Sequence, residues 1–145
     1  MTIQRLEHVG IVVEDLAAAT EFFEELGLDL EGETSVEGAL VDRIVGLEGV
    51  SSEIVILRTP DGQGKVELAK FHSPPGPSGD PEAPSNAAGI RHILFAVEEL
   101  DAILARVKAR GFDLVGELES YEDSYRLCYI RGPEGIIVEL AEKIG

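Results

Sequence analysis

The chain has 145 residues, of which 44% are apolar, and it carries 28 acidic against 12 basic side chains. The formal net charge is 12 − 28 = −16 with the three histidines counted as neutral. This acid excess argues against binding to nucleic acid or to an anionic membrane, because both interactions need Lys and Arg side chains beside phosphates. The length is typical of a single domain with its own core, and the apolar content is too high for a disordered chain.

The first residues and the cysteine content bear on the location of the protein. Cys128 is the one cysteine, so no internal disulfide can form, which fits a reducing compartment. The chain opens MTIQRLEH and is charged almost at once, unlike the apolar run of a signal peptide. No apolar stretch approaches the roughly 20 residues of a membrane span. We therefore expect a cytoplasmic protein that binds neither nucleic acid nor membranes.

The sequence contains an internal repeat. The segment HVGIVVEDL, which begins at His8, aligns without a gap with HILFAVEEL, which begins at His92, at an offset of 84 residues. A second repeat closes each half, because RTPDG is followed by VELA at Val66–Ala69 and RGPEG by VELA at Val138–Ala141. Each half is thus expected to be one supersecondary unit, and the two units bury a shared face.

The first half is predicted to contain a strand, a helix and three further strands. Runs of β-branched residues indicate the strands, and apolar residues spaced by three and four indicate the helix. Between the second and third strands, Val41–Val50 is expected to be an insertion with a short helical turn. The expected elements are a strand over Leu6–Val13, a helix from its N-cap Asp15 to Leu26 that stops at Gly27, a strand within Glu31–Ala39, and strands over Glu53–Thr59 and Lys65–Phe71.

The second half repeats this order after a proline-rich connector. The expected elements are a strand over Ile90–Val97, a helix with Leu100, Ile103, Leu104 and Val107 as its apolar stripe and Gly111 as its stop, and strands over Leu114–Tyr121, Tyr125–Arg131 and Ile136–Ala141. We therefore expect one domain over residues 1–145. It consists of a first module over about residues 3–72, a Pro-rich linker over 73–88 and a second module over about 89–143.

Four polar residues are expected on the sheet faces that point away from the helices. Side chains alternate along a strand, so if Val9 and Ile11 face the helix, His8 faces the opposite way. The same alternation applies to the other three residues, which are Glu67, His92 and Glu139. Two imidazoles and two carboxylates suit one divalent ion such as Zn, Ni, Co, Fe or Mn. The pattern predicts a metal site with positions left open for a substrate.

These motifs resemble the vicinal oxygen chelate superfamily, which includes glyoxalase I, methylmalonyl-CoA epimerase, extradiol dioxygenases, fosfomycin-resistance enzymes and bleomycin-binding proteins. The resemblance covers about Leu6 to Glu142, without the linker and Val41–Val50. It implies an α+β fold in which two tandem βαβββ modules have curled mixed sheets that enclose a metal cleft, with helices on the outer face. It also implies a homodimer and a small-molecule substrate, and the family's four metal positions fall on His8, Glu67, His92 and Glu139.

The ligand pattern is similar to the His-Glu-His-Glu set of bacterial-type glyoxalase I, whereas the epimerases usually carry Gln in place of Glu67. The resemblance therefore implies a metal-dependent lyase or isomerase that abstracts a proton next to a carbonyl and hydroxyl pair on the metal. Glu139 or Glu67 would be the base. The alternatives are an epimerase like the methylmalonyl-CoA enzyme, a non-catalytic binding or resistance protein and, less favoured because of the fourth protein ligand, an extradiol oxygenase. Arg126, Tyr129 and Arg91 are candidate substrate-binding residues.

Overall fold

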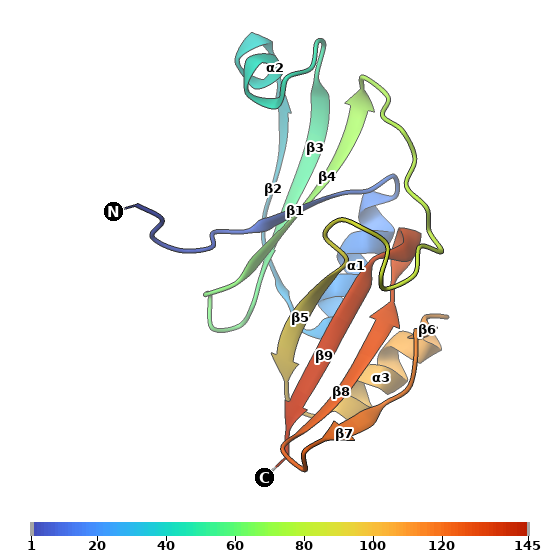
Figure 1. Cartoon of the computed structure of the whole chain (residues 1–145). Coiled ribbons are helices and arrows are strands. Elements are labelled where there is room, and N and C mark those ends of the chain that lie inside the picture. The colour runs from blue at the N-terminus through green and yellow to red at the C-terminus, as the bar shows by residue number, and fades with distance from the viewer. Residues whose placement is uncertain (1, 145) are drawn as a thin grey trace. The chain divides into compact units, whose positions relative to one another are not determined.

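The computed structural model describes residues 2–144 and contains two compact units, one ending at Ser78 and the other beginning at Gly79 (Figure 1). Each unit has one mixed sheet, in which the first and last strands of the unit pair in parallel and the other strand pairs are antiparallel. The sheets are curled but not closed. The prediction of an α+β fold with two βαβββ units is confirmed, whereas the division into one domain with a linker over 73–88 stays a prediction.

The first unit has a four-stranded sheet in the order β1-β4-β3-β2, with β1 parallel to β4. Its elements are β1 (Val9–Val12), α1 (Leu16–Leu26), β2 (Asp29–Glu37), α2 (Ala39–Val45), β3 (Ser51–Arg58) and β4 (Lys65–Ser73). Helix α1 begins where Asp15 accepts a hydrogen bond from the Ala18 amide at 3.0 Å, and it ends at Gly27 in the left-handed conformation. The predicted start and stop of this helix are thus confirmed.

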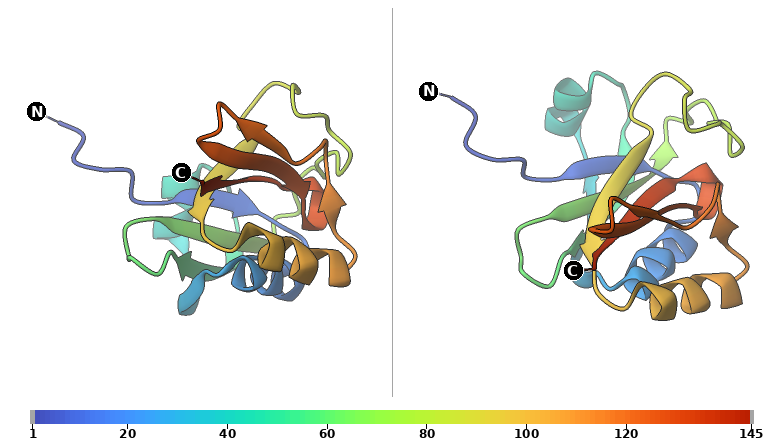
Figure 2. Two further views of the ribbon diagram at one scale, coloured as in Figure 1. Left: turned by 90° about the horizontal axis from the view of Figure 1, so that it is seen from below. Right: turned by 60° about the horizontal axis from the view of Figure 1, so that its bottom comes forward.

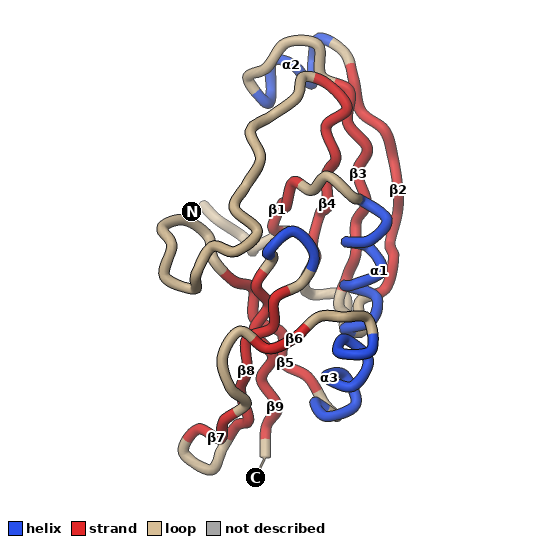
Figure 3. The backbone as a smooth tube through the Cα atoms, turned by 90° about the vertical axis from the view of Figure 1, so that its right-hand side faces the viewer, coloured by secondary structure: helices blue, strands red, loops and turns tan. Residues whose placement is uncertain are grey.

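Helix α1 covers one face of the first sheet (Figure 3). Phe23 of the helix and Leu57 and Leu68 of the sheet are fully buried, and each such side chain stabilises the fold by about 1.5–3 kcal/mol. Along β1 the burial alternates, with Val9 and Ile11 partly covered and Gly10 and Val12 exposed. The opposite face of this sheet is therefore the one that carries the predicted polar residues.

Helix α2 begins at Ala39, two residues before the predicted insertion, and ends inside it, at the far end of β2 and β3 from α1 (Figure 1). None of its residues is buried, and Leu40 and Ile44 are mostly exposed. Asp42 fixes the return of the chain by accepting hydrogen bonds from the amides of Gly49 and Val50. The helix thus lies beyond the packed part of the unit.

The second unit repeats the strand and helix order of the first, except that two short strands stand in place of β2 and α2. Its elements are β5 (His92–Val97), α3 (Leu100–Ala109), β6 (Asp113–Leu114), β7 (Glu119–Tyr121), β8 (Tyr125–Arg131), the 3₁₀ turn η1 (Pro133–Gly135) and β9 (Ile137–Lys143). The strand order is β5-β9-β8-β6, with β7 also paired to β8, and α3 runs along this sheet (Figure 2). Among the described residues, no helix is long and apolar enough to cross a membrane.

The prediction of one continuous strand over Leu114–Tyr121 is wrong, because two short strands take its place. Leu114 pairs with Ile130 and Glu119 pairs with Leu127. Between these two pairs the first segment advances by five residues (119 − 114), whereas β8 advances by three (130 − 127). The two extra residues leave the ladder near Gly116 and divide the strand.

Candidate functional site

The two units build the same local arrangement from the same strand register. In the first unit Gly10 of β1 pairs with Glu67 of β4, and in the second unit Leu94 of β5 pairs with Glu139 of β9. Because paired residues point to the same face, and residues two apart on a strand do so as well, each glutamate shares a face with the histidine two residues before its partner. The repeat in the sequence is thus a repeat in space.

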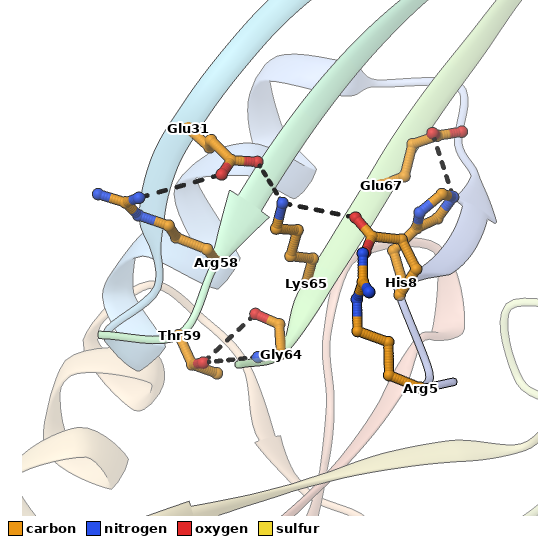
Figure 4. Close-up of polar contacts among 9 residues, drawn as sticks. Arg5, His8, Glu31, Arg58, Thr59, Gly64, Lys65 and Glu67 are labelled. Atoms are coloured by element: carbon orange, nitrogen blue, oxygen red, sulfur yellow. Dashed lines mark hydrogen bonds and ion pairs between the residues drawn. The ribbon is translucent and has the colours of Figure 1, made fainter. Parts of the chain in front are cut away.

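In each unit this register brings the predicted histidine and glutamate together. His8 Nε2 lies 3.3 Å from Glu67 Oε2 (Figure 4). His92 Nε2 lies 3.3 Å from Glu139 Oε1. Both glutamate side chains are largely covered, with 26% of Glu67 and 14% of Glu139 exposed, while the histidines are more open. Each pair presents an imidazole nitrogen and carboxylate oxygens to the same small region of its sheet.

The donor chemistry of the two pairs fits a divalent metal of the nitrogen- and oxygen-binding kind. No thiolate competes, because Cys128 pairs with Leu140 on the helix side of its sheet and is buried, and burial raises the pKa of its thiol. Within residues 2–144, no group of three or more His, Cys, Asp or Glu side chains lies close enough together to hold a metal ion. Each unit therefore offers half of the predicted ligand set.

Tyr129 is placed where it can act on one of these histidines. It lies opposite Glu139 on β8, and its hydroxyl oxygen is 3.4 Å from His92 Nδ1. The two rings are 4.8 Å apart at their centroids. In the first unit the residue opposite Glu67 is Ile56, which has no polar atom to offer His8. The two otherwise matched pairs thus differ in their second contact.

The other two candidate substrate-binding residues are placed differently. Arg126 is paired with Glu142 on β8 and β9, and its guanidinium bonds Asp101 of α3 at 2.8 Å and Glu142 at 3.2 Å. The hydrogen bond that Arg126 donates to Asp101 holds the pKa of the Asp101 carboxyl below its usual value. Arg126 thus contacts helix α3 from the face opposite that of Glu139, and its role in substrate binding stays a prediction. Arg91, next to His92, has a buried Nε with no hydrogen-bond partner among the described residues.

Beside the His8–Glu67 pair lies a row of charged side chains that the sequence analysis missed. Lys65 Nζ lies 3.2 Å from Glu31 and 3.5 Å from Glu7, and hydrogen bonding to Glu31 raises the pKa of the Lys65 amine. Arg58 Nη1 lies 4.0 Å from Glu31 (Figure 4). At the other end Arg5 bonds Glu7 at 3.0 Å, and its hydrogen bond lowers the pKa of the Glu7 carboxyl. The row holds three cations and two carboxylates.

A rigid turn and a bulge create this row. Arg58 and Lys65 are directly paired across β3 and β4, and their common turn is closed by hydrogen bonds between Thr59 and Gly64 at 2.8 and 3.0 Å. Glu31 is the extra residue of a bulge, because Leu30 pairs with Leu57 while Gly32 already pairs with Ile56. The pairing across the turn was available from the sequence, whereas the bulge was not.

Comparison with known proteins places this architecture in context. Residues 5–140 match the family described as the Glyoxalase/Bleomycin resistance protein/Dioxygenase superfamily. The crystal structure of a glyoxalase family protein from Bacillus cereus is similar with 46% identity and a TM-score of 0.96, covering 100% of this chain and 97% of that one. The uncharacterized protein YwbC of Bacillus subtilis is 27% identical over 97% of this chain and 98% of its own. The fosfomycin resistance protein FosX of Listeria monocytogenes shares the fold, with 17% identity, a TM-score of 0.62 and coverage of 99% and 95% of the two chains.

Proposed function

The chain belongs to the Glyoxalase/Bleomycin resistance protein/Dioxygenase superfamily, and we propose that it is a metal-dependent lyase or isomerase of the glyoxalase I type. The observation that carries the proposal is the pair of matched contacts, His8 with Glu67 and His92 with Glu139, each at 3.3 Å on equivalent faces of the two repeats. The buried leucines of the two VELA segments recur because they fill the cores, but these partly exposed His–Glu pairs fill no core, so their recurrence favours a shared chemical role.

In this proposal His8, Glu67, His92 and Glu139 hold one divalent ion. The donors are imidazole nitrogens and carboxylate oxygens, which suit Zn, Ni, Co, Fe or Mn. When bound, such an ion polarises adjacent carbonyl and hydroxyl oxygens of a substrate and acidifies the neighbouring C–H bond. The two carboxylates offset the charge of the ion, so the composition of the site favours no particular substrate charge.

The proton is moved by a glutamate of the same set. Glu139 is our choice over Glu67 because its side chain is more enclosed, with 14% against 26% exposed, and an enclosed carboxylate is held in fewer orientations. It takes a proton from the carbon next to the carbonyl and returns it. Return to the neighbouring carbon gives an isomerisation, and return to the other face of the same carbon gives an epimerisation. General-base catalysis of this kind contributes about 10²–10⁴-fold to the rate.

The test combines metal analysis with deuterium exchange. Purified protein is analysed for bound metal and then incubated in D₂O with a panel of small 2-oxo hemithioacetals, 2-hydroxy carbonyl compounds and thioesters. We expect one metal ion per His8/Glu67/His92/Glu139 set and deuterium wash-in at the carbon next to the carbonyl. Glu139→Gln should abolish the exchange with the fold intact by circular dichroism, whereas Glu98→Gln, at an exposed position, should leave it unchanged.

The alternatives are outcomes of the same experiment. Wash-in with inversion at a single carbon would make the protein an epimerase. Protein that binds small molecules but takes up no stoichiometric metal would be a binding or resistance protein, and the enzyme proposal would fall. Full exchange by Glu139→Gln would show that the base is another residue. The homodimeric assembly and cytoplasmic location implied by the sequence belong to this proposal too, and light scattering of the purified protein tests the former.

A further inference from the structure

The charged row beside His8 and Glu67 runs against the overall charge of the chain. Its members are Arg5, Glu7, Glu31, Arg58 and Lys65, which sum to 3 − 2 = +1, whereas the whole chain carries −16. In so acidic a protein, most of the surface repels anions. Asp29, which is directly paired with Arg58, and Glu67 add two carboxylates to this neighbourhood, so what distinguishes it is the gathering of three cations beside the predicted metal ligands and not its net charge.

Within the row, Arg58 has unused hydrogen-bonding capacity. Among residues 2–144, the one ion pair of its guanidinium is with Glu31 at 4.0 Å, which is too long for a hydrogen bond. Half of its side chain is exposed. A guanidinium has five N–H donors in a planar fork that matches two oxygens of one carboxylate or phosphate. Lys65 differs, because it already lies near two carboxylates, at 3.2 and 3.5 Å.

The position of Arg58 relative to Glu67 is fixed by the sheet. Arg58 pairs with Lys65, and Ile56 pairs with Glu67, so Arg58, Lys65 and Glu67 share one face. Two residues along a strand span about 7 Å, and the neighbouring strand lies about 5 Å away. The backbone positions of Arg58 and Glu67 are therefore separated by about 8 Å, so that one small molecule can reach both side chains.

The second unit does not repeat this feature. Arg131 takes the place of Arg58 in the RGPEG motif, but its guanidinium donates to the backbone carbonyls of Pro81 and Gly135. Its partner across the strands is Ile137, which is 3% exposed, in the place that Lys65 has in the first unit. Of these two equivalent arginines, Arg58 keeps donors for a ligand on the face of its glutamate, whereas Arg131 spends donors on the backbone.

We propose that Arg58, supported by Lys65, binds an oxyanionic group at one end of the substrate, a carboxylate or a phosphate, while the reacting end lies at the predicted metal ligands. Glu31 competes with that group for the two cations and is displaced from Arg58 when it binds. Because the matched His–Glu pairs are nearly symmetric and this cation pair is not, Arg58 also decides which way round the substrate lies. This inference rests on the proposed function for the identity of the reacting end.

The experiment uses probes that differ only in an anionic tail. Lactate is compared with malate, 2-hydroxyglutarate and 2-hydroxyadipate, which carry the same 2-hydroxy acid head and a second carboxylate at increasing distance; 3-phospholactate tests a phosphate tail. Binding to the full chain is measured by calorimetry with and without added metal. We expect at least one anionic tail to bind about tenfold more tightly than lactate, since hydrogen bonds to charged groups are worth about 1.5–3 kcal/mol.

Three substitutions separate a specific contact from general electrostatics. Arg58→Gln should remove most of the preference for the anionic tail, a loss of about tenfold. Glu31→Gln removes the competing carboxylate and should strengthen binding of the same probe by several fold. Arg43→Gln removes an equal charge from the exposed helix α2 of the same unit and should change binding less than about twofold, as expected for a screened distant charge.

The results also separate this inference from the proposed function. Equal effects of Arg58→Gln and Arg43→Gln, no gain from Glu31→Gln, or no tail preference in the unaltered protein would each overturn the role of Arg58. If the protein takes up metal but any of these three contrary outcomes is observed, the role of Arg58 fails and the proposed reaction does not. If it takes up no metal but metal-free protein still binds the tail through Arg58, the proposed reaction fails and the anion site stands.

Discussion

Replacing Tyr129 with phenylalanine tests whether the second contact of His92 tunes its ability to bind metal. The substitution removes one hydroxyl, 3.4 Å from His92 Nδ1, and keeps the ring that lies 4.8 Å from the imidazole. Packing is nearly unchanged, because the aromatic ring is the same. Any effect should therefore come from the lost hydrogen bond.

The tyrosine hydroxyl is useful to His92 in two protonation patterns. Without metal, Nε2–H can donate to Glu139, 3.3 Å away, and the hydroxyl donates to the bare Nδ1. When Nε2 is a metal ligand, Nδ1 carries the proton and the hydroxyl accepts it. A hydroxyl can reverse its role and phenylalanine cannot. We therefore expect Tyr129→Phe to weaken metal binding and to change the tautomer of His92.

The magnitude follows from the distance. The metal-free protein loses a long hydrogen bond of 3.4 Å, and the metal-bound protein loses one from an Nδ1–H that the ion makes a stronger donor, so the affinity changes by the difference between the two, about 0.5 to 1 kcal/mol. The metal dissociation constant should rise by a factor of about two to five.

The assay pairs metal affinity, measured by competition with a chromogenic chelator, with ¹⁵N chemical shifts of the histidine side chains. His8 is an internal control, because Ile56 stands where Tyr129 stands in the other unit. An unchanged His92 tautomer together with unchanged metal affinity would refute the reasoning. An equal shift at His8 would show a general perturbation instead of a local contact.

Two further predictions concern stability and thiol chemistry. Glu142→Ala should lower the free energy of unfolding by about 2 kcal/mol, because it removes the acceptor of the fully buried Leu100 amide at the start of α3. Urea unfolding should show a lower midpoint with an unchanged slope. The control Glu98→Ala, at an exposed position, should change the free energy of unfolding by less than about 0.5 kcal/mol. Cys128 is 3% exposed and burial raises its pKa, so alkylation at pH 8 should be at least about tenfold slower in native than in urea-unfolded protein. The pKa of this thiol is higher in the folded than in the unfolded protein, so the stability that Cys128 contributes is complete below the unfolded pKa and is lost as pH rises through the folded pKa. Cys128→Ala should therefore flatten the decline of stability at alkaline pH. An identical decline in both proteins would contradict the raised pKa of Cys128.

The matched His–Glu pairs could be predicted from the sequence because they depend on rules that act locally. Alternation along a strand puts His8 and Glu67 on the face opposite the buried valines, and the repeat transfers the same reasoning to His92 and Glu139. The helix stop at Gly27 follows from the left-handed conformation that glycine tolerates. The faces and the helix stop need only neighbours within one strand or one helix, whereas the 3.3 Å contacts themselves depend on the register of β1 with β4 and of β5 with β9.

The remaining features depend on register between strands or on irregular pairing. The strand that holds Arg126 was predicted with its observed bounds, yet the face of Arg126 was not, although the apolar alternation of Cys128 and Ile130 already placed even-numbered residues on the helix side. Glu31 reaches the charged row because of a bulge, which no composition signal marks. The division of the predicted strand near Gly116 likewise depends on how two segments share β8.

The exposed α2 segment makes this chain a convenient scaffold for engineering. Glu37 and Ser51, which flank it, are directly paired on adjacent strands, so the chain leaves and re-enters the sheet at one point. A tight hairpin turn could bridge that point, and a peptide tag or a sensor domain grafted there would begin and end side by side. None of the α2 residues is buried and neither His–Glu pair belongs to this segment, so a graft that keeps the buried Val50 should leave the core and the candidate site unaltered.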